Sequence, residues 1–365
     1  ENGWLIGKKW DWAIMVVVGH IFWVSDFGRF AVFGFYILSG YLMTYVMQNS
    51  YGYAHSSKIK FAKNRFLRLF PAYWLACTTT ILLILLLGLS EDGKYAIIFI
   101  PDTITSIFGN FTLVFPHWMP NQIEPRLSPA TWALTVELFF YTAIALGASK
   151  TINRTYIWVA LSFAFIIATY WLDLFWHARY FSIPAGSLPF SLGALIFFLV
   201  KDNKTKFIPA VWANDPHTSI VTMLAIAIFV SSTITKGLPL WAMEILFYCS
   251  LIISFLLVLS LAMGKPFTSF IPKALDKKLG DFSYPFYLLH YQAAAIASYI
   301  IYGQVTVFKG SITINSILLT FTALFLLSLI IIKWVDNPIE KLRIKIKNAK
   351  RQDKPINQVQ SGENT

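Results

Sequence analysis

The apolar residues of this chain are gathered into long blocks instead of alternating with polar ones, as in Leu69–Leu89 and Leu240–Met263. Each block has the length of about 20 residues that a helix needs to cross the hydrocarbon core of a bilayer. A backbone in lipid must satisfy its own hydrogen bonds, so such a block forms a helix unless the chain is a closed barrel. Barrel strands alternate apolar and polar positions over about ten residues, and these blocks do not. The pattern predicts an all-α, polytopic membrane protein.

Blocks of this kind predict about ten transmembrane helices. We place them near residues 4–24, 27–49, 69–89, 130–149, 155–176, 180–200, 218–235, 240–263, 282–303 and 311–335. The stretch 95–115 is also apolar, but Pro101, Asp102, Gly109 and Asn110 interrupt it, so we expect a re-entrant or interfacial segment there. The first block lacks a cleavage site of small residues, and we therefore expect a retained helix and not a signal peptide.

The 30 lysine and arginine residues are divided unequally between the two sides of the predicted membrane. With the N-terminus in the cytoplasm, all but six lie on the cytoplasmic side, and those six are Arg29, Lys94, Arg126, Arg179, Lys236 and Lys309. Short cytoplasmic loops carry an excess of basic residues, so we expect both termini in the cytoplasm. We also expect a transmembrane domain at 1–335 and a polar, basic cytoplasmic tail at 336–365, solvated near an anionic lipid surface.

Composition narrows the possible functions. Charged residues make up 13% of the chain, about half of the roughly 25% that is typical of soluble domains. The formal net charge of +12 follows the loops, so it reports topology, and we expect no nucleic-acid partner. The two cysteines, Cys77 and Cys249, lie inside apolar blocks, which excludes a disulfide framework and a CxxC metal site; we expect no metal. The sequence contains no GxSxG, HExxH, P-loop or dinucleotide motif, so the chemistry must come from the helices and their short loops.

A charged side chain in mid-membrane costs about 2.5–3.5 kcal/mol, which makes each one a functional candidate. Lys9 and His20 are eleven residues apart and project from one face of the first predicted helix, about 16 Å apart along its axis. A neutral imidazole at His20 suits general-base action on a hydroxyl group. A buried histidine that is satisfied by one hydrogen bond would explain the same pattern.

A second candidate is Glu137, which shares a helix face with Tyr141 at i, i+4. A carboxylate at this depth needs a partner, and His20 at a similar depth on another helix could provide it. That pair would be a base held by an orienting acid, and a structural ion pair is the alternative. Arg65 and Arg68 lie at i, i+3 at the cytoplasmic mouth of the third predicted span. Their guanidinium groups suit phosphates, although the topology alone also predicts basic residues there.

A polar stripe follows the inner half of the ninth predicted span, where Ser283, Tyr287 and His290 share a face at i, i+4 and i+7. The stripe could line a channel for an acyl donor, or it could hydrogen-bond between helices. The residues alone leave both possibilities open.

At these positions the chain resembles the acyltransferase-3 family of bacterial membrane O-acyltransferases. The resemblance runs in order along nearly the whole chain, and its segments are the basic position ten residues or so before His20, FGRFAVFGFYILSGYL at Phe27–Leu42, RFLRLFPAYW at Arg65–Trp74, TWALTVELFFY at Thr131–Tyr141, SYPFYLLH at Ser283–His290 and the late Asn337-Pro338. The resemblance implies about ten helices in a bacterial cytoplasmic membrane. It also implies transfer of an acyl group, usually acetyl from acetyl-CoA, to a hydroxyl group that commonly belongs to a sugar of a cell-surface polysaccharide or glycolipid.

The match also implies roles for individual residues. His20 would be the catalytic histidine, and Glu137 and Thr135 would match the family's glutamate and serine. Arg65 and Arg68 would match its arginines, which with Lys9 and His290 would bind the acyl-CoA donor; the list of expected donor-binding residues is Lys9, Arg65, Arg68 and His290.

The sequence departs from the family pattern in three ways. Lys9 stands where arginine is usual, which keeps the charge but loses bidentate geometry. Thr135 replaces serine and keeps the hydroxyl. An extracytoplasmic esterase-like domain, which the family often carries, is absent from this sequence, so we expect transfer to be completed alone or with a separate partner.

Two other functions remain open at this stage. A transporter or flippase for a lipid-linked sugar would share the spans and the buried polar residues. The sixth predicted span looks broken by Pro184, Gly186, Pro189 and Gly193, but it has no counterpart in an inverted half, which a transporter of this kind would show. The other possibility keeps the enzyme class and changes the substrates to a succinyl donor or a small-molecule acceptor.

Overall fold

The computed structural model describes residues 25–87, 99–124, 126–202, 238–263, 273–305 and 313–348, and the regular elements in these ranges are all helices. Seven helical segments are long and apolar enough to cross a membrane: Ala31–Tyr51, His55–Leu87, Pro129–Leu146, Ile152–Trp171, Trp176–Lys201, Leu240–Ala262 and Ile314–Arg343. Each corresponds to one predicted span, so the prediction of an all-α, polytopic membrane protein is confirmed. The predicted spans 4–24 and 218–235 lie outside the described residues, and the total of ten stays a prediction.

An eighth predicted span, 282–303, also falls on a described helix. This helix is α13 (Lys273–Tyr302), which has 30 residues and contains most of that span. Its first turns carry charged residues, and it is not among the seven apolar segments. Likewise α4 (His55–Leu87) begins well before the predicted span 69–89. The basic segment that precedes the span has no helix breaker before Pro71, so it simply continues the same helix.

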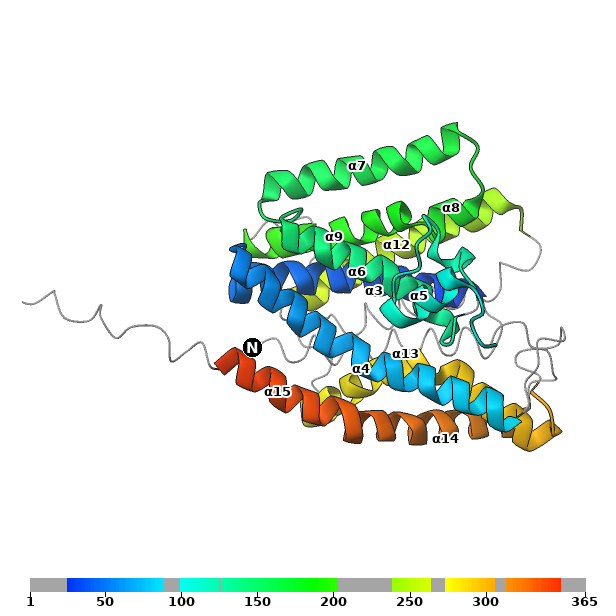
Figure 1. Ribbon diagram of the computed structural model, residues 1–365. Coiled ribbons are helices and arrows are strands. Elements are labelled where there is room, and N and C mark those ends of the chain that lie inside the picture. The colour runs from blue at the N-terminus through cyan, green and yellow to red at the C-terminus, as the bar shows by residue number, and fades with distance from the viewer. Residues whose placement is uncertain are drawn as a thin grey trace, which may run out of the picture.

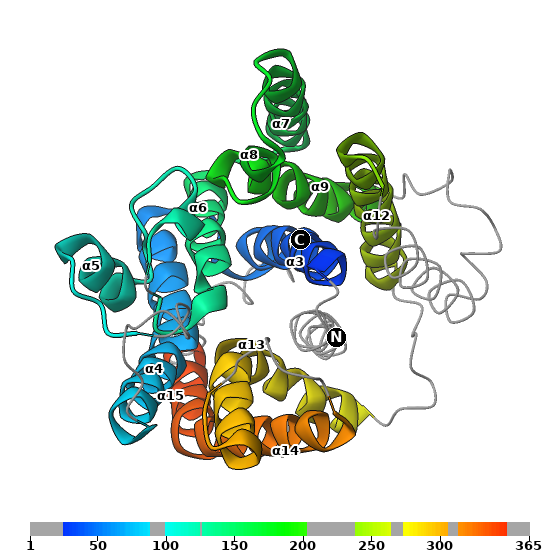
Figure 2. The same cartoon turned by 90° about the vertical axis from the view of Figure 1, so that its right-hand side faces the viewer.

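The helices form two groups that lie side by side (Figures 1 and 2). The first group contains α3 (Ser25–Val46), α6 (Trp132–Leu146), α7 (Ile152–Trp171), α9 (Ile183–Lys201) and α12 (Leu240–Ala262). The second contains α4, α13, α14 (Ile314–Ile331) and α15 (Asn337–Asn348), and the π-helical turn η4 (Ile332–Asp336) joins the last two. Shorter elements complete the described chain: η1 (Met47–Tyr51), α5 (Ile104–Thr112), η2 (Pro120–Gln122), η3 (Pro129–Thr131) and α8 (Trp176–Tyr180).

Two glycines allow α3 and α9 to approach each other closely. A Cβ atom on Gly40 would lie 2.2 Å from the carbonyl oxygen of Phe190, and one on Gly193 would lie 2.0 Å from that of Ile37. Only a residue without a side chain fits at such backbone contacts, and small residues play this part in many helix pairs in membranes. The pair forms the centre of the first group.

The predicted break in the sixth span is wrong, because α9 is continuous from Ile183 to Lys201. Pro184 lies in the first turn, where its missing N–H would have had no partner within the helix. Gly186 and Gly193 serve close packing, and a Cβ on Gly186 would lie 2.4 Å from Cγ1 of Val136. The feature that could have pointed to a transporter is therefore a packing feature.

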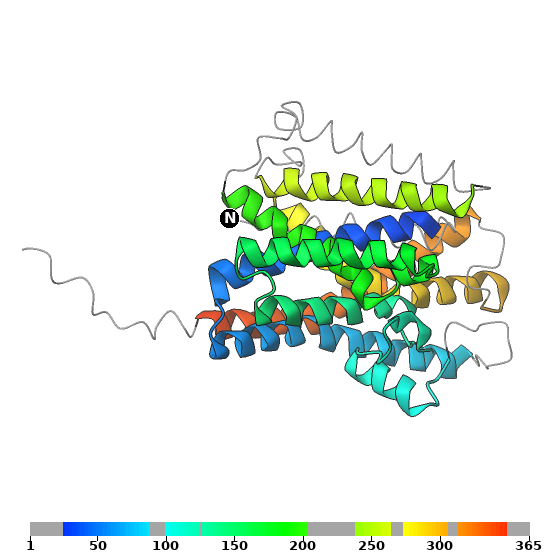
Figure 3. The same ribbon diagram turned by 90° about the horizontal axis from the view of Figure 1, so that it is seen from above.

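Residues 99–124 and 126–131, which precede α6, lie together toward one end of the bundle, beside the last turns of α4 (Figures 1 and 3). We call this end the loop end. Within the predicted interfacial stretch 95–115, the structure places the nine-residue helix α5, which begins with a capping box at Thr103. Asn110 fastens this helix, because its backbone oxygen accepts a hydrogen bond from Tyr73 over 2.9 Å and its side-chain oxygen accepts one from the backbone of Leu127 over 2.7 Å. Arg126 then donates to the carbonyl groups of Asn121, Ile123 and Pro129.

The opposite end, which we call the basic end, holds the first turns of α4, the turn between α6 and α7, the end of α9 and the helix α15 (Figure 1). These segments carry Lys58, Lys63, Arg65, Lys150, Arg154, Lys201 and Arg343. Toward the loop end, Arg126 forms an ion pair with Glu124 at 3.3 Å and Arg179 forms one with Glu244 at 2.5 Å. This division follows the one used for the predicted orientation, and the orientation itself stays a prediction.

Candidate active site

A cavity of about 60 Å³ lies between the two groups of helices. A cavity needs about 10–15 Å³ to hold one water molecule, so this one has room for several small groups. Four helices contribute its lining, which consists of Val32, Phe35 and Tyr36 from α3, Arg65, Arg68 and Leu69 from α4, Ala133, Leu134, Glu137 and Tyr141 from α6, and Ser283, Tyr284 and Tyr287 from α13.

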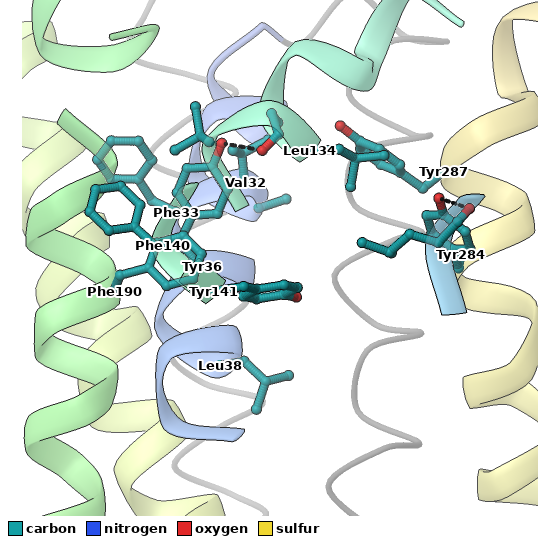
Figure 4. Close-up of a cluster of buried hydrophobic side chains, with 14 of the residues drawn as sticks. Val32, Phe33, Tyr36, Leu38, Leu134, Phe140, Tyr141, Phe190, Tyr284 and Tyr287 are labelled. Atoms are coloured by element: carbon teal, nitrogen blue, oxygen red, sulfur yellow. Dashed lines mark hydrogen bonds between the residues drawn. The ribbon is translucent and has the colours of Figure 1, made fainter. Parts of the chain in front are cut away.

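Tyrosines from both groups face each other across this space (Figure 4). Tyr36 and Tyr141 stand on one side, and Tyr284 and Tyr287 stand on the other. The hydroxyl of Tyr284 donates to the backbone carbonyl of Leu69 over 2.9 Å, and that of Tyr287 donates to the carbonyl of Ala130. These two hydroxyls therefore attach α13 to α4 and to η3 at the edge of the cavity.

Glu137 is a buried carboxylate with one oxygen firmly held. Its Oε1 accepts a hydrogen bond from Ser39 of α3 over 2.5 Å and another from Tyr141, one turn along α6, over 2.7 Å. Its Oε2 makes no hydrogen bond with any residue that the structure describes. The predicted pairing with Tyr141 at i, i+4 is present. The arrangement fixes the carboxylate in one orientation and leaves its second oxygen able to accept a hydrogen bond.

The arginines of α4 lie on the same cavity, toward the basic end. Arg65 is within electrostatic range of Glu137 and Tyr141. Its Nη2 donates to Oδ1 of the neighbouring Asn64 over 3.1 Å. Arg68 is half-buried and makes no hydrogen bond within the described ranges. The structure thus brings Arg65, Arg68 and Glu137 together, as two cations and one anion on a single cavity.

Two predicted site residues do not line this cavity. Thr135 is buried, and its hydroxyl donates to the backbone carbonyl of Leu113 over 3.0 Å, which attaches α6 to the segment 99–124 at the loop end. His290 is buried in α13, with Nδ1 at 2.9 Å from the carbonyl of Tyr287. The remaining two, His20 and Lys9, lie outside the described residues.

Sequence reasoning missed Ser39, which holds Glu137. It belongs to the Leu38-Ser39-Gly40 segment that carried part of the family resemblance, so a signal was present, but the contact partner was not readable from the chain. Among the described residues, no group of three or more His, Cys, Asp or Glu side chains could hold a metal ion.

The comparisons with known proteins agree with this picture. The chain is similar to a protein of Komagataeibacter xylinus that carries the name "Putative membrane-bound transacylase BcsY", with 22% identity over 310 residues that cover 80% of this chain and 72% of that protein. No solved structure is significantly similar to this chain. A family model described as an acyltransferase domain matches residues 4–335. With helices of membrane-spanning length and this match over nearly the whole chain, the protein belongs to the acyltransferase-3 family of membrane enzymes that transfer acyl groups.

Proposed function

We propose that this protein transfers an acyl group, most simply acetyl, from acyl-CoA to a hydroxyl group of a cell-surface glycan or glycolipid, and that it does so in a bacterial cytoplasmic membrane. The observation that carries the proposal is the shared cavity of Arg65, Arg68 and Glu137. Guanidinium groups match the phosphates of CoA, and a carboxylate in the interior of a membrane protein is a candidate functional residue because its burial is costly.

In this proposal the donor enters from the basic end. The phosphates of CoA bind near Arg65 and Arg68, with Lys9 as a further cation. The thioester then points along the cavity toward Glu137, past the apolar side chains that line it. Excluding water from the site lowers the competition of water with the acceptor hydroxyl.

His20 removes the proton of the acceptor hydroxyl in the transfer step. The hydroxyl oxygen attacks the carbonyl carbon of the thioester, the carbon–sulfur bond breaks, and CoA leaves as a thiolate that takes up the proton. Glu137 accepts a hydrogen bond from the imidazole through Oε2, which orients the base and stabilises its protonated form. A route in which His20 carries the acyl group transiently would use the same groups. We assign no step to Thr135 or His290, because neither lines the cavity.

The acceptor hydroxyl approaches from the loop end, which the predicted topology places outside the cytoplasm. A sugar hydroxyl on a polysaccharide or a lipid-linked glycan fits this side, since the donor and the acceptor then reach the same cavity from opposite faces of the membrane.

The test is incubation of the full-length protein, purified into lipid nanodiscs, with radiolabelled acetyl-CoA. We expect the wild-type protein to release CoA and to transfer or retain the label, and folded His20→Ala protein to do neither. Lys63→Ala removes an exposed charge from α4 and serves as the matched control, with unchanged turnover. Full activity in folded His20→Ala protein would overturn the mechanism. Failure of the wild type to consume either acetyl-CoA or succinyl-CoA would overturn the choice of donor class.

A further inference from the structure

The side chain of Arg343, on α15, contacts α4 beside the arginines of the cavity. Its Nη2 donates to Oδ1 of Asn64 over 3.0 Å. The same oxygen accepts a hydrogen bond from Nη2 of Arg65 over 3.1 Å. A single amide oxygen therefore holds two guanidinium groups, one from each end of the described chain. The side chain of Arg343 is only 16% exposed, so this is an enclosed contact.

Three guanidinium groups gather near this contact between α4 and α15. The guanidinium groups of Arg65, Arg68 and Arg343 lie close enough to repel one another. Three carboxylates oppose these charges. Glu340 pairs with Arg343 and is 53% exposed, Asp336 is within electrostatic range of Arg68 and Arg343, and Glu137 is within electrostatic range of Arg65. Asp281 lies near Asp336. The pair of Arg343 with Glu340 is partly exposed, and ion pairs exposed to water are weak.

Asn64 is neutral, and this has a consequence for the cluster. Because an amide accepts hydrogen bonds without carrying charge, it positions Arg65 and Arg343 and leaves their positive charge available. A carboxylate at this position would hold both groups more strongly and would also cancel that charge. The residue type therefore favours a site that is arranged to bind an anion over one arranged only for stability.

Two N–H groups of the arginines in this cluster have no hydrogen-bond acceptor among the described residues. The Nε atoms of Arg65 and Arg343 are buried and have no hydrogen-bond partner within the described part of the chain. Buried donors without partners are uncommon in folded proteins. A ligand with several anionic oxygens would supply acceptors for both of these donors.

The path of the backbone explains how α15 presents Arg343 to α4. The helix α14 continues through the π-helical turn η4, in which the backbone N–H of Asn337 bonds to the carbonyl of Ile332. A π turn adds one residue to the repeat and rotates the following helix relative to the preceding one, and such turns occur frequently at functional sites. Asp336, Glu340 and Arg343 then share one face at i, i+4 and i+7.

We propose that Arg343 is a further ligand-binding residue, which forms a three-arginine site with Arg65 and Arg68 for a phosphate-bearing ligand, with Asn64 as its positioning residue. The assignment of the ligand as the CoA donor rests on the proposed function, because the site adjoins the cavity in which the transfer would occur. An anionic lipid headgroup presents the same phosphate chemistry, and the experiment separates the two sources.

The experiment is calorimetric titration of CoA, without an acyl group, into the full-length protein in phosphatidylcholine nanodiscs. We expect Arg343→Ala to weaken CoA binding about tenfold, which is the effect of losing one charge-assisted hydrogen bond. Lys341→Ala removes an exposed charge from the same helix and should change the affinity less than twofold.

Asn64→Asp separates a binding role from a structural one. The carboxylate keeps both hydrogen bonds but neutralises the arginines, so we expect weaker CoA binding with an equal or higher melting temperature. A site that only fastens α15 to α4 predicts the same rise in melting temperature with unchanged CoA affinity. Unchanged affinity in both Arg343→Ala and Asn64→Asp overturns the proposal.

A parallel series in phosphatidylglycerol nanodiscs tests the lipid source. If phosphatidylglycerol stabilises the wild type but not Arg343→Ala, while the affinity for CoA is equal in both, the assignment to the donor is overturned. CoA can bind without acyl transfer. If CoA binding depends on Arg343 but the protein consumes no acetyl-CoA, the proposed function is overturned and the inference about Arg343 stands. Normal turnover with an unchanged KM for acetyl-CoA in Arg343→Ala would overturn this inference alone.

Discussion

The hydroxyl of Ser39 on α3 donates a 2.5 Å hydrogen bond to Oε1 of Glu137 on α6. Both side chains are buried, and the contact joins two helices of the first group next to the cavity. Tyr141 donates to the same oxygen. The carboxylate is therefore held from two directions, and Oε2, which makes no hydrogen bond with the described residues, has a fixed position from which to accept one.

Ser39→Ala should lower kcat for acetyl transfer about tenfold, because a hydrogen bond to a charged group contributes about 1.5–3 kcal/mol. The KM for acetyl-CoA should stay unchanged, since Ser39 bonds to the carboxylate and does not itself line the cavity that would receive the donor. Steady-state kinetics in nanodiscs measures both. Thr44→Ala is the matched control, because it removes a buried hydroxyl of the same helix that bonds to Ser149 over 2.9 Å. Equal losses in both variants would mean that Ser39 acts through general packing of α3.

Glu137→Gln should abolish most of the transfer and leave the binding of CoA intact. The amide oxygen of glutamine can still accept hydrogen bonds from Ser39 and Tyr141, so the fold should persist, but the negative charge that stabilises a protonated base is lost. We expect turnover to fall at least a hundredfold, which is the lower end of what general acid–base groups contribute. Calorimetry with CoA and turnover of labelled acetyl-CoA give the two readings. Lost CoA binding would contradict the division of roles between Glu137 and the arginines.

The helices and the charge division could be predicted because both are local patterns. A block of apolar residues predicts a membrane-spanning helix whatever its neighbours are. Glu137 is recognisable in such a block because a carboxylate is costly to place in the membrane interior and is therefore a functional candidate. The same local reasoning failed at α9, where prolines and glycines looked like breaks. Pro184 occupies the first turn of α9, where proline is tolerated. Gly193 is required by the close approach of the α3 backbone, and this contact cannot be deduced from the sequence of α9 alone.

The remainder of the site depends on contacts between distant segments. In the sequence, Asn64 is an ordinary polar residue among basic ones. Only the structure shows that Arg343 donates a hydrogen bond to it. The part of the predicted tail that forms α15 looked solvated because its composition is basic and polar, yet the π turn η4 directs one of its arginines to α4. The roles of His20 and Lys9 remain predictions, since both lie outside the described residues.

Gly193→Ala should destabilise the protein although alanine is the better helix former. Alanine at an unconstrained position in a helix gains about 0.5–1 kcal/mol over glycine, but here its Cβ would lie 2.0 Å from the backbone oxygen of Ile37. Backbone must move, and overpacking of this kind costs about 1–3 kcal/mol. A melting curve in detergent measures the change. Gly186→Ala on the same helix is the graded control, because its clash is with the side chain of Val136, which can shift. A higher melting temperature for Gly193→Ala would contradict the close approach of α3 and α9.

Arg68→Ala should raise the KM for acetyl-CoA about tenfold with little change in kcat. Its guanidinium lines the cavity and makes no hydrogen bond with the described residues, so its loss removes a contact to the donor phosphates without breaking a hydrogen bond in that part of the chain. Because half-exposed charges are screened by salt over about 8–10 Å, the KM of the wild type should rise with ionic strength, and that of Arg68→Ala should rise less. The KM of Arg68→Lys should lie between those of the wild type and Arg68→Ala, since lysine keeps the positive charge but cannot bind a phosphate through two parallel N–H groups. Lys63→Ala carries the same change of net charge from an exposed position of α4, and an equal rise in its KM would show that the donor responds to the general charge of the basic end and not to Arg68.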